Sequence, residues 1–294
     1  MKTIIVVTGG AGFVGSNLIE ELVKIKKYKI LSIDNYSSGK ISNHISSSKV
    51  KYLKGNTKNI SVILEKYKNK IHSIFHFGEF ARIYQSFKKI NECFSSNIEG
   101  SSSVFNFALK NKIRLVYSAT SASLGNKGKD MNLSPYAFSK AKNLELLENL
   151  KKWFNFKYEV IYFYNVYGER QICKGDMATV VGIFEDHFKL GKKLPVVRPG
   201  TQERRFTHIF DTVKACIIAW RKNESKHYSI ASKKSYSILE LAKMFNGQIR
   251  YVPKRKGERF ASALTKMNLN NKIIRLSAKI KLRDYIKNFL INNR

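Results

Sequence analysis

The 294-residue chain has few cysteines, few prolines and no long apolar run. Its three cysteines, Cys93, Cys173 and Cys216, are far apart and include no C-x-x-C pair, which argues against a disulfide framework and against a zinc site. No apolar run approaches the roughly 20 residues that span a bilayer, and the N-terminal MKTIIVV leads into a glycine-rich turn instead of a cleavage site. We therefore expect a soluble, cytoplasmic protein that has no bound metal and whose cysteines are buried free thiols.

Acidic residues are also scarce, since 54 Lys and Arg stand against 21 Asp and Glu, a formal net charge of +33. Such a charge attracts nucleic acid, an anionic membrane surface or phosphorylated substrates. The basic residues are mostly lysines spread along the whole chain beside abundant Asn and Ile, which is also the result of a general compositional bias. Compositional bias is the favoured explanation, and contact with nucleic acid or a membrane surface is kept as an alternative.

Short β-branched segments alternate with helical patterns in the first half of the chain. Segments of this kind are TIIVVT, KILSID, KVKYLKG, IHSIFHF and IRLVYSA. The first helical pattern places Val14, Leu18, Leu22 and Ile25 on one face. Strands separated by amphipathic helices indicate βαβ units and a parallel sheet covered on both faces. The predicted fold class is therefore α/β, with a Rossmann-type doubly wound parallel sheet.

A second, smaller lobe is expected after about residue 165, where the alternation weakens. The predicted division is residues 1–164 for the sheet domain and mainly residues 165–294 for a C-terminal α/β lobe, with the chain free to cross between them. Four prolines and no low-complexity linker indicate that the lobes pack directly. The C-terminal LRDYIKNFLI has Leu282, Ile286 and Phe289 on one helical face; packing against the second lobe is favoured over lying on a membrane surface.

A glycine-rich turn, TGGAGFVG, joins the first expected strand to the first helix. Gly9 permits the tight turn, Gly12 lets backbone N–H groups approach a pyrophosphate, and Gly15 allows close packing of helix on strand. The second strand ends in Asp34, nineteen positions after Gly15. A carboxylate there can accept hydrogen bonds from the adenosine ribose and would repel a 2′-phosphate, which favours NAD over NADP.

Another motif, SPYAFSK, places Tyr136 four positions before Lys140. The same spacing occurs at Tyr36 and Tyr84, each followed by a lysine, so the spacing alone identifies no site. Positions four apart share one face of a helix, so the ammonium can lie near the phenol oxygen. A further motif is needed to choose among the three tyrosines.

The motifs together resemble the extended short-chain dehydrogenase/reductase family, particularly its nucleotide-sugar epimerases of the UDP-glucose 4-epimerase type. The resemblance covers nearly the whole chain in one order, through blocks that include TGGAGFVGSN, HFGEFARIYQS, YSATSASLG, SPYAFSK, YFYNVYGERQ and GTQERRFTHIFD. It implies NAD as cofactor, a nucleotide-diphosphate sugar as substrate and a homodimer. The resemblance also chooses among the tyrosines, because only Tyr136 matches the family's catalytic Y-x-x-x-K.

Three catalytic residues are implied by the resemblance: Thr120, Tyr136 and Lys140. Tyr136 would be the general base, with Lys140 and the positive nicotinamide favouring its phenolate, and the Thr120 hydroxyl would bridge it to the substrate. Sugar 4,6-dehydratases of the family carry an Asp-Glu pair directly after that threonine. Ser121 and Ala122 stand here instead, and neither can serve as the acid or base of water elimination, which argues against a dehydratase.

The cofactor contacts implied by the resemblance begin at the glycine turn and continue along the chain. Asn56 with Thr57 would lie near the adenine, where the family usually has Asp at the first position, and Asn97 would lie near the nicotinamide. The expected set is Gly9, Gly12, Phe13, Val14, Gly15, Asp34, Asn35, Asn56, Thr57, Asn97, Tyr136 and Lys140.

The substrate side is expected to involve Ser118, Asn165, Arg204 and Arg255. The two arginines match the family's diphosphate-binding arginines, and guanidinium groups suit phosphate oxygens because they bind them bidentately. Glu79 and Arg82, in HFGEFAR, are unusual for that loop; contact with the sugar and an ion pair on the loop are both open.

The leading hypothesis is an NAD-dependent epimerase that inverts carbon 4 of a nucleotide-diphosphate hexose through a keto intermediate. The nearest alternative is a nucleotide-sugar dehydrogenase or ketoreductase of the same fold, which needs the same three residues. A basic RNA- or membrane-binding protein on this fold is the third, motivated by the charge alone.

Overall fold

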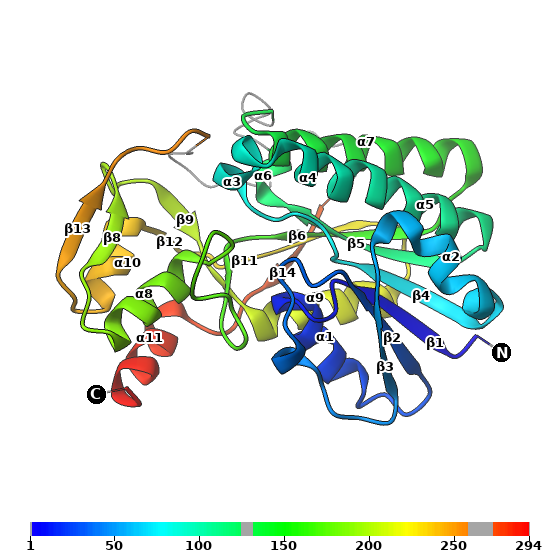
Figure 1. Cartoon of the computed structure of the whole chain (residues 1–294), viewed down its shortest axis with the longest axis horizontal. Coiled ribbons are helices and arrows are strands. Elements are labelled where there is room, and N and C mark those ends of the chain that lie inside the picture. The colour runs from blue at the N-terminus through cyan, green and yellow to red at the C-terminus, as the bar shows by residue number, and fades with distance from the viewer. Residues whose placement is uncertain (1, 125–131, 258–272, 294) are drawn as a thin grey trace.

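A parallel sheet of eight strands forms the larger lobe of the computed structural model, which describes residues 2–124, 132–257 and 273–293 (Figure 1). Every neighbouring pair in the sheet is parallel. In sheet order the strands are β14 (Ile273–Ser277), β11 (His227–Ala231), β6 (Tyr158–Phe163), β5 (Arg114–Thr120), β4 (Ile71–His76), β1 (Ile4–Thr8), β2 (Lys29–Asp34) and β3 (Val50–Lys54). The predicted fold class is confirmed.

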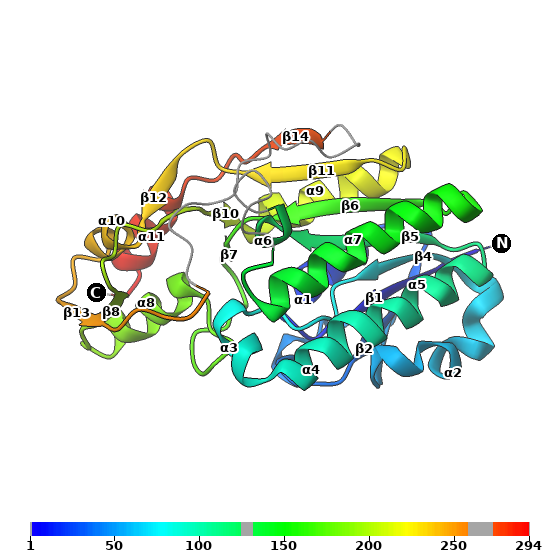
Figure 2. The same ribbon diagram turned by 90° about the horizontal axis from the view of Figure 1, so that it is seen from above.

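Helices cover both faces of the sheet (Figures 1 and 2). On one face lie α1 (Phe13–Leu22) and α9 (Ile209–Lys222), and on the other lie α2 (Ile60–Leu64), α5 (Ser101–Lys110) and α7 (Pro135–Phe154). Three shorter helices, α3 (Ile83–Lys88), α4 (Ile90–Phe94) and α6 (Ser121–Leu124), lie along the strand ends near α7.

The central strands explain why their sequences are continuously apolar. Ile4 and Val6 of β1 pack into the core beneath α5 and α7, whereas Ile5 and Val7 pack into the core beneath α1 and α9. Side chains alternate between the faces of a strand, so a strand buried on both faces needs apolar residues at every position. All five residues of β1 are buried.

The smaller lobe is built on three two-stranded sheets and a core of its own. Its strand pairs are β8 (Leu194–Val197) with β13 (Ile249–Val252), β9 (Glu203–Arg205) with β12 (Ser235–Ser237), and β7 (Val166–Tyr167) with β10 (Thr207–His208). Its helices are α8 (Val180–Lys189), α10 (Ile238–Met244) and α11 (Leu282–Ile291). The chain crosses between the lobes repeatedly, because α9, β11 and β14 belong to the large sheet lobe although they follow residue 164.

Two local details differ from the sequence interpretation. Helix α1 ends at Leu22, before Ile25, because the chain must reverse to begin β2 at Lys29 beside the start of β1; Ile25 still packs against the same core. All three cysteines are free thiols, but Cys173 is only partly buried.

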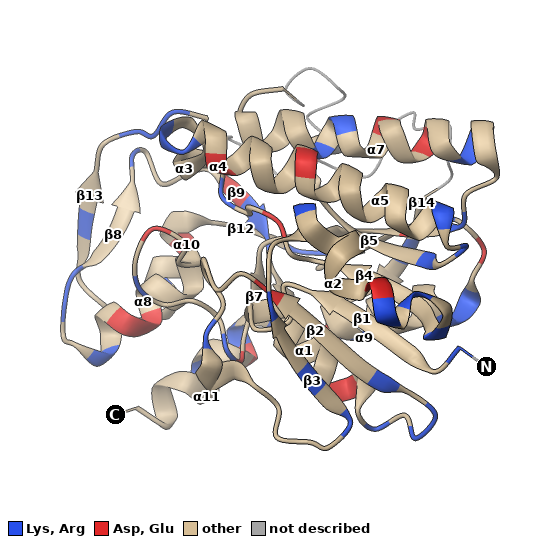
Figure 3. Cartoon of the chain, turned by 45° about the vertical axis from the view of Figure 1, so that its right-hand side comes forward, with Lys and Arg blue, Asp and Glu red and all other residues tan. Residues whose placement is uncertain are grey.

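The excess of basic residues is distributed over the molecule. Figure 3 shows Lys and Arg on helices, strands and loops of both lobes. No helix within the described parts of the chain is long and apolar enough to cross a membrane.

Helix α11 packs its apolar face against the smaller lobe. Leu282 and Ile286 are 4% and 1% exposed, and Phe289 lies against Phe188 and Phe245. The choice left open by the sequence is therefore resolved in favour of packing, since the face that a membrane would need is already covered.

This packing predicts a contrast between two isoleucines of the same helix. Ile286→Ala should lower the free energy of unfolding by about 2–5 kcal/mol, because it opens a cavity in the core. Ile291→Ala, at a position that is 58% exposed, should change it by no more than about 0.5 kcal/mol. Urea unfolding of both variants measures the difference, and equal, small effects would show that α11 does not anchor this lobe.

Candidate functional site

A cavity of about 570 Å³ opens at the carboxyl ends of the central strands. Its wall includes the last residue of β2, β5 and β6 and the first residue after β1 and β4. These residues are Asp34, Thr120, Phe163, Gly9 and Phe77. The carboxyl ends of parallel strands meet at one edge of a sheet, and in doubly wound folds ligands bind in the crevice there.

The glycine turn forms the part of this wall nearest to α1. Gly9 has a φ of +70°, which glycine adopts without strain. A Cβ on Gly15 would lie 2.1 Å from the Gly9 carbonyl oxygen, so glycine is required for the helix to start this close to the strand. Gly12, Phe13 and Val14 line the cavity at the first turn of α1, where backbone N–H groups have no partners within the helix.

Asp34 is the last residue of β2 and lies beside the glycine turn. Its two carboxylate oxygens accept hydrogen bonds from the backbone N–H groups of Ala11 (2.9 Å) and Tyr36 (2.8 Å). Burial raises the pKa of this carboxyl, and these two backbone donors act against the rise. Each carboxylate oxygen can accept more than one hydrogen bond, so Asp34 keeps capacity for the hydroxyls of a ribose.

The residues assigned to the adenine side also reach the cavity. Asn35, Asn56 and Thr57 all line it. Asn56 caps the short helical turn that follows, because its side-chain oxygen accepts a hydrogen bond from Lys58 N. This hydrogen bond fixes the Asn56 side chain at the cavity wall.

The three residues assigned to catalysis come together at the other end of the cavity. Thr120 ends β5, and Tyr136 and Lys140 lie one turn apart at the start of α7; all three line the cavity. The pKa of Tyr136 is raised to about 12, because burial and the Glu79 charge raise it more than its hydrogen bond with Thr120 and the Arg82 charge lower it. The phenol is therefore protonated at neutral pH in this state.

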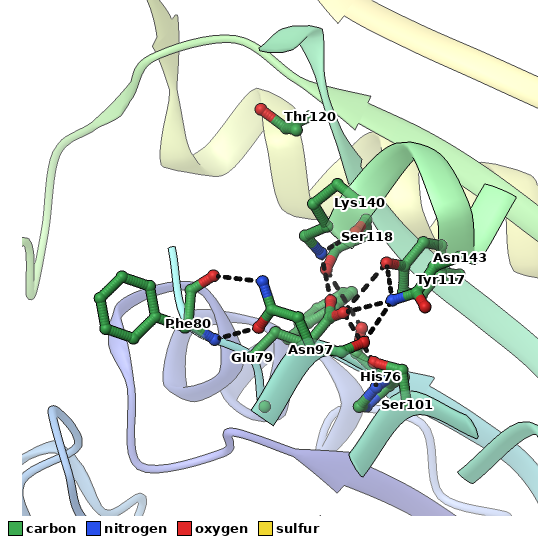
Figure 4. Close-up of polar contacts among 12 residues, drawn as sticks. His76, Glu79, Phe80, Asn97, Ser101, Tyr117, Ser118, Thr120, Lys140 and Asn143 are labelled. Atoms are coloured by element: carbon green, nitrogen blue, oxygen red, sulfur yellow. Dashed lines mark hydrogen bonds and ion pairs between the residues drawn. The ribbon is translucent and has the colours of Figure 1, made fainter. Parts of the chain in front are cut away.

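Lys140 is held from below by an acidic residue. Its ammonium forms an ion pair with Glu79, which follows β4, and donates to the Ser118 carbonyl at 2.7 Å (Figure 4). The two side chains are 4% and 2% exposed. Burial lowers the pKa of Lys140, and the Glu79 carboxylate acts against that change.

The loop after β4 decides one of the two alternatives that the sequence left open for Glu79 and Arg82, the ion pair on the loop. They do not pair with each other. Arg82 lines the cavity and donates to the carbonyls of Ala81 and Met177, and within the described residues it has no acidic partner. The signal that could have identified Glu79 was its place directly after a buried strand, at the edge where the site forms.

Asn97 lies behind the cavity wall instead of lining it. It is fully buried in a π-helical turn, and its amide bonds the backbone N–H (2.7 Å) and carbonyl (3.0 Å) of Phe80. A third contact reaches Ser139 Oγ at 3.1 Å. These bonds fix the loop that carries Glu79, so the structure places Asn97 as a support for the wall.

Of the four residues assigned to the substrate, only Ser118 lines this cavity. Asn165 bonds the Arg205 carbonyl, Arg204 bonds the Glu203 carbonyl on β9, and the guanidinium of Arg255 lies 5.6 Å from the centre of the Tyr84 ring. The structure does not bring these three side chains to the cavity wall, and their roles stay predictions.

The residues present fit a dinucleotide. The turn is free of side chains where a Cβ would clash, Asp34 can accept further hydrogen bonds, and polar groups continue to Lys140 at the far end. Across residues 2–124, 132–257 and 273–293, no three His, Cys, Asp or Glu side chains are placed to hold a metal ion.

Comparison with known proteins gives relatives over most of the chain. The chain is 30% identical to UDP-N-acetyl-alpha-D-glucosaminuronate decarboxylase of Bacillus cytotoxicus over 264 residues, which covers 82% of this chain and 79% of the relative. The fold matches UDP-glucose 4-epimerase of Thermotoga maritima with a TM-score of 0.86, 24% identity and 98% coverage of both chains. A UDP-N-acetylglucosamine 4-epimerase of Methanobrevibacter ruminantium matches with a TM-score of 0.83 and 25% identity, covering 99% of this chain and 97% of that one.

The family comparison agrees with the cavity, the glycine turn and the cluster around Tyr136. The family described as NAD dependent epimerase/dehydratase matches residues 5–231. The chain therefore belongs to the NAD dependent epimerase/dehydratase family, an extended short-chain dehydrogenase/reductase group whose cofactor is NAD.

Proposed function

We propose that the protein is a nucleotide-sugar epimerase that inverts carbon 4 of a nucleotide-diphosphate hexose. The observation that carries the proposal is that Thr120, Tyr136 and Lys140 line the same cavity as the glycine turn and Asp34. Ser121 and Ala122 follow Thr120, so the acid and base that water elimination requires are not at those positions.

The reaction requires the protein to transfer a proton from and to the hydroxyl on carbon 4. When bound, NAD supplies the hydride acceptor and donor for carbon 4. Tyr136 removes the proton from the carbon 4 hydroxyl and returns it to the new hydroxyl, and Thr120 orients that hydroxyl through its own bond to Tyr136. Between the two transfers the keto-sugar turns over in the pocket, so that its other face is reduced.

The proposal also includes a binding site for the substrate diphosphate and a homodimer. Arg204 and Arg255 are proposed to hold the substrate diphosphate, which requires their side chains to move from the positions described above. A homodimer is proposed from the family resemblance.

The alternative is a net dehydrogenase or ketoreductase on a nucleotide sugar. It stays open because it needs the same Thr120, Tyr136 and Lys140. Arg82, a cavity-lining guanidinium with only backbone partners in the described chain, suits an acidic sugar in either reaction. Such a dehydrogenase would consume NAD stoichiometrically, and such a ketoreductase would consume NADH.

The test is proton NMR of the purified protein with a panel of UDP-, GDP- and CDP-hexoses and no added NAD. Conversion of one sugar into its 4-epimer supports the proposal, since it shows a redox-neutral reaction with retained cofactor. If turnover requires stoichiometric NAD and a keto-sugar accumulates, the dehydrogenase takes its place.

Tyr136→Phe should reduce turnover by about a hundredfold to ten-thousandfold, the usual contribution of a general acid–base group. The matched control is Tyr84→Phe, a tyrosine with the same spacing to a lysine that lies outside the cavity wall. NAD content, measured on the denatured protein by chromatography, should be the same in both variants and the wild type. Undiminished turnover by Tyr136→Phe would remove Tyr136 from the mechanism.

Asp34→Asn should weaken NAD binding about tenfold or more, because a charged acceptor for the ribose is lost. Binding of NADP should weaken much less, since the repulsion of the 2′-phosphate is lost as well. Calorimetric titration of cofactor-stripped protein measures both dissociation constants. An unchanged ratio of the two constants would show that Asp34 does not set the cofactor preference.

A further inference from the structure

We propose that Glu79 is a positioning residue of this site. Its carboxylate fixes the Lys140 ammonium beneath the cavity and balances the positive charge of that ammonium. Tyr136 therefore keeps its proton until the positively charged oxidised cofactor binds. The proposal rests on the proposed role of Tyr136. Glu79 follows β4 at the strand edge where the cavity opens, and its side chain is 2% exposed.

Four side chains from three different elements hold the Glu79 carboxylate (Figure 4). Oε1 accepts hydrogen bonds from Ser101 Oγ at 2.8 Å, from the Tyr117 hydroxyl at 2.9 Å and from Asn143 Nδ2 at 3.3 Å. Oε2 accepts from Lys140. Both oxygens are satisfied in the ionised form, which a buried carboxylate requires.

A chain of hydrogen bonds behind Glu79 points toward the carboxylate. Ser101 Oγ donates to Glu79, so it accepts from His76 Nε2 at 2.9 Å. His76 Nδ1 then accepts from Thr8 Oγ1 at 2.7 Å. Burial lowers the pKa of His76 to about 4, so the ring is neutral and can play both parts. With Glu79 ionised, each hydroxyl and ring hydrogen in this chain can be directed along it toward the carboxylate.

Lys140 is fixed by the same arrangement. An ammonium group has three N–H donors. In the described structure one is used on Glu79 and one on the Ser118 carbonyl, and the nitrogen lies 4.6 Å from the centre of the Tyr117 ring. One donor has no hydrogen-bond acceptor among the described residues, and Lys140 lines the cavity.

The charge of Lys140 is therefore balanced before any ligand binds. The titratable and charged groups that act on Glu79 or share its surroundings come from five elements: His76 of β4, Arg82 of the following loop, Cys93 of α4, Tyr117 of β5, and Tyr136 and Lys140 of α7. Burial and the Glu79 charge both raise the pKa of Tyr136, and Arg82 is the charged group that lowers it. Removal of the Glu79 charge should therefore lower the pKa of Tyr136.

This balance suits a reaction in which one group must both take and return a proton. A phenolate stabilised by an unopposed lysine would be a weak acid catalyst for the return step. Because Glu79 and Lys140 together carry no net charge, the ionisation of Tyr136 would depend on the charge of the cofactor. Tyr136 would then be a phenolate while the cofactor is oxidised and a phenol while it is reduced, within one turnover.

The test is NMR of protein that carries ¹³C at the ζ carbon of tyrosine and is saturated with NAD. The pH is raised from about 6 to about 10, and Tyr136 is expected to ionise within this range because the positive nicotinamide lowers its pKa. Tyr136→Phe identifies the Tyr136 signal. In Glu79→Gln the midpoint of Tyr136 should lie about one pH unit below that of the wild type, the usual effect of a nearby charge. The matched control Ser101→Ala removes one donor to Glu79 but no charge, and should keep the wild-type midpoint.

Equal midpoints in the wild type and Glu79→Gln, or no ionisation of Tyr136 in either, would overturn the proposal. If Glu79→Gln does not fold, Glu79→Asp tests positioning instead. Its shorter side chain cannot reach Ser101 and Lys140 together, so NAD should bind about 3- to 10-fold more weakly, and unchanged NAD affinity would overturn the proposal.

Neither readout uses sugar turnover, so the two proposals can fail separately. A shifted midpoint in a protein that epimerises no sugar would leave the role of Glu79 standing and remove the proposed function. An unshifted midpoint in an active epimerase would do the reverse.

Discussion

The parallel direction of the strands is the constraint on which the rest of the site depends. Because β1, β2, β4, β5 and β6 all end at one edge, residues from five distant parts of the sequence meet there. The glycine turn, Asp34, Glu79 and Thr120 each follow or end a different strand. An antiparallel arrangement of the same strands would send half of them to the opposite edge.

The second constraint is electrostatic, and it concerns the charges buried beneath the cavity. Removing an ammonium and a carboxylate from water costs several kcal/mol for each ion unless the pair is well placed and its other hydrogen-bonding capacity is met. Lys140 and Glu79 satisfy both conditions through Ser101, Tyr117 and the Ser118 carbonyl. The polar contacts under the cavity therefore fix Lys140 to β5 and Glu79 to α5, β5 and α7.

The sequence predicted the parts of the site that depend on local spacing. The turn from Gly9 to Gly15 and Asp34 at a strand end need only a few neighbouring residues to be recognised. The pair Tyr136 and Lys140 needed the family resemblance as well, because the same spacing occurs at two other tyrosines. All of these residues line the cavity. The fold class followed from the alternation of strands and helices in the same way.

Features that depend on convergence of distant segments could not be predicted. The partner of Glu79 was one of these, because residues 79, 101, 117 and 140 approach only when β4, α5, β5 and α7 are packed. The amide of Asn97 was expected near the cofactor, yet its bonds are made to Phe80, since a buried amide must satisfy its hydrogen bonds locally. The Arg204 side chain bonds the Glu203 carbonyl on β9, and the Arg255 guanidinium lies over the Tyr84 ring of α3; a sequence match cannot give these orientations.

In the proposed reaction carbon 4 is inverted and the hydrogen bound to it returns to the same carbon. The most direct measurement is mass spectrometry and NMR of the product formed from a nucleotide hexose that carries deuterium at carbon 4, with the reaction run in ordinary water. The account predicts a 4-epimer that retains the deuterium at carbon 4. Loss of the label with accumulation of a keto-sugar, or uptake of solvent hydrogen at a neighbouring carbon, would contradict it.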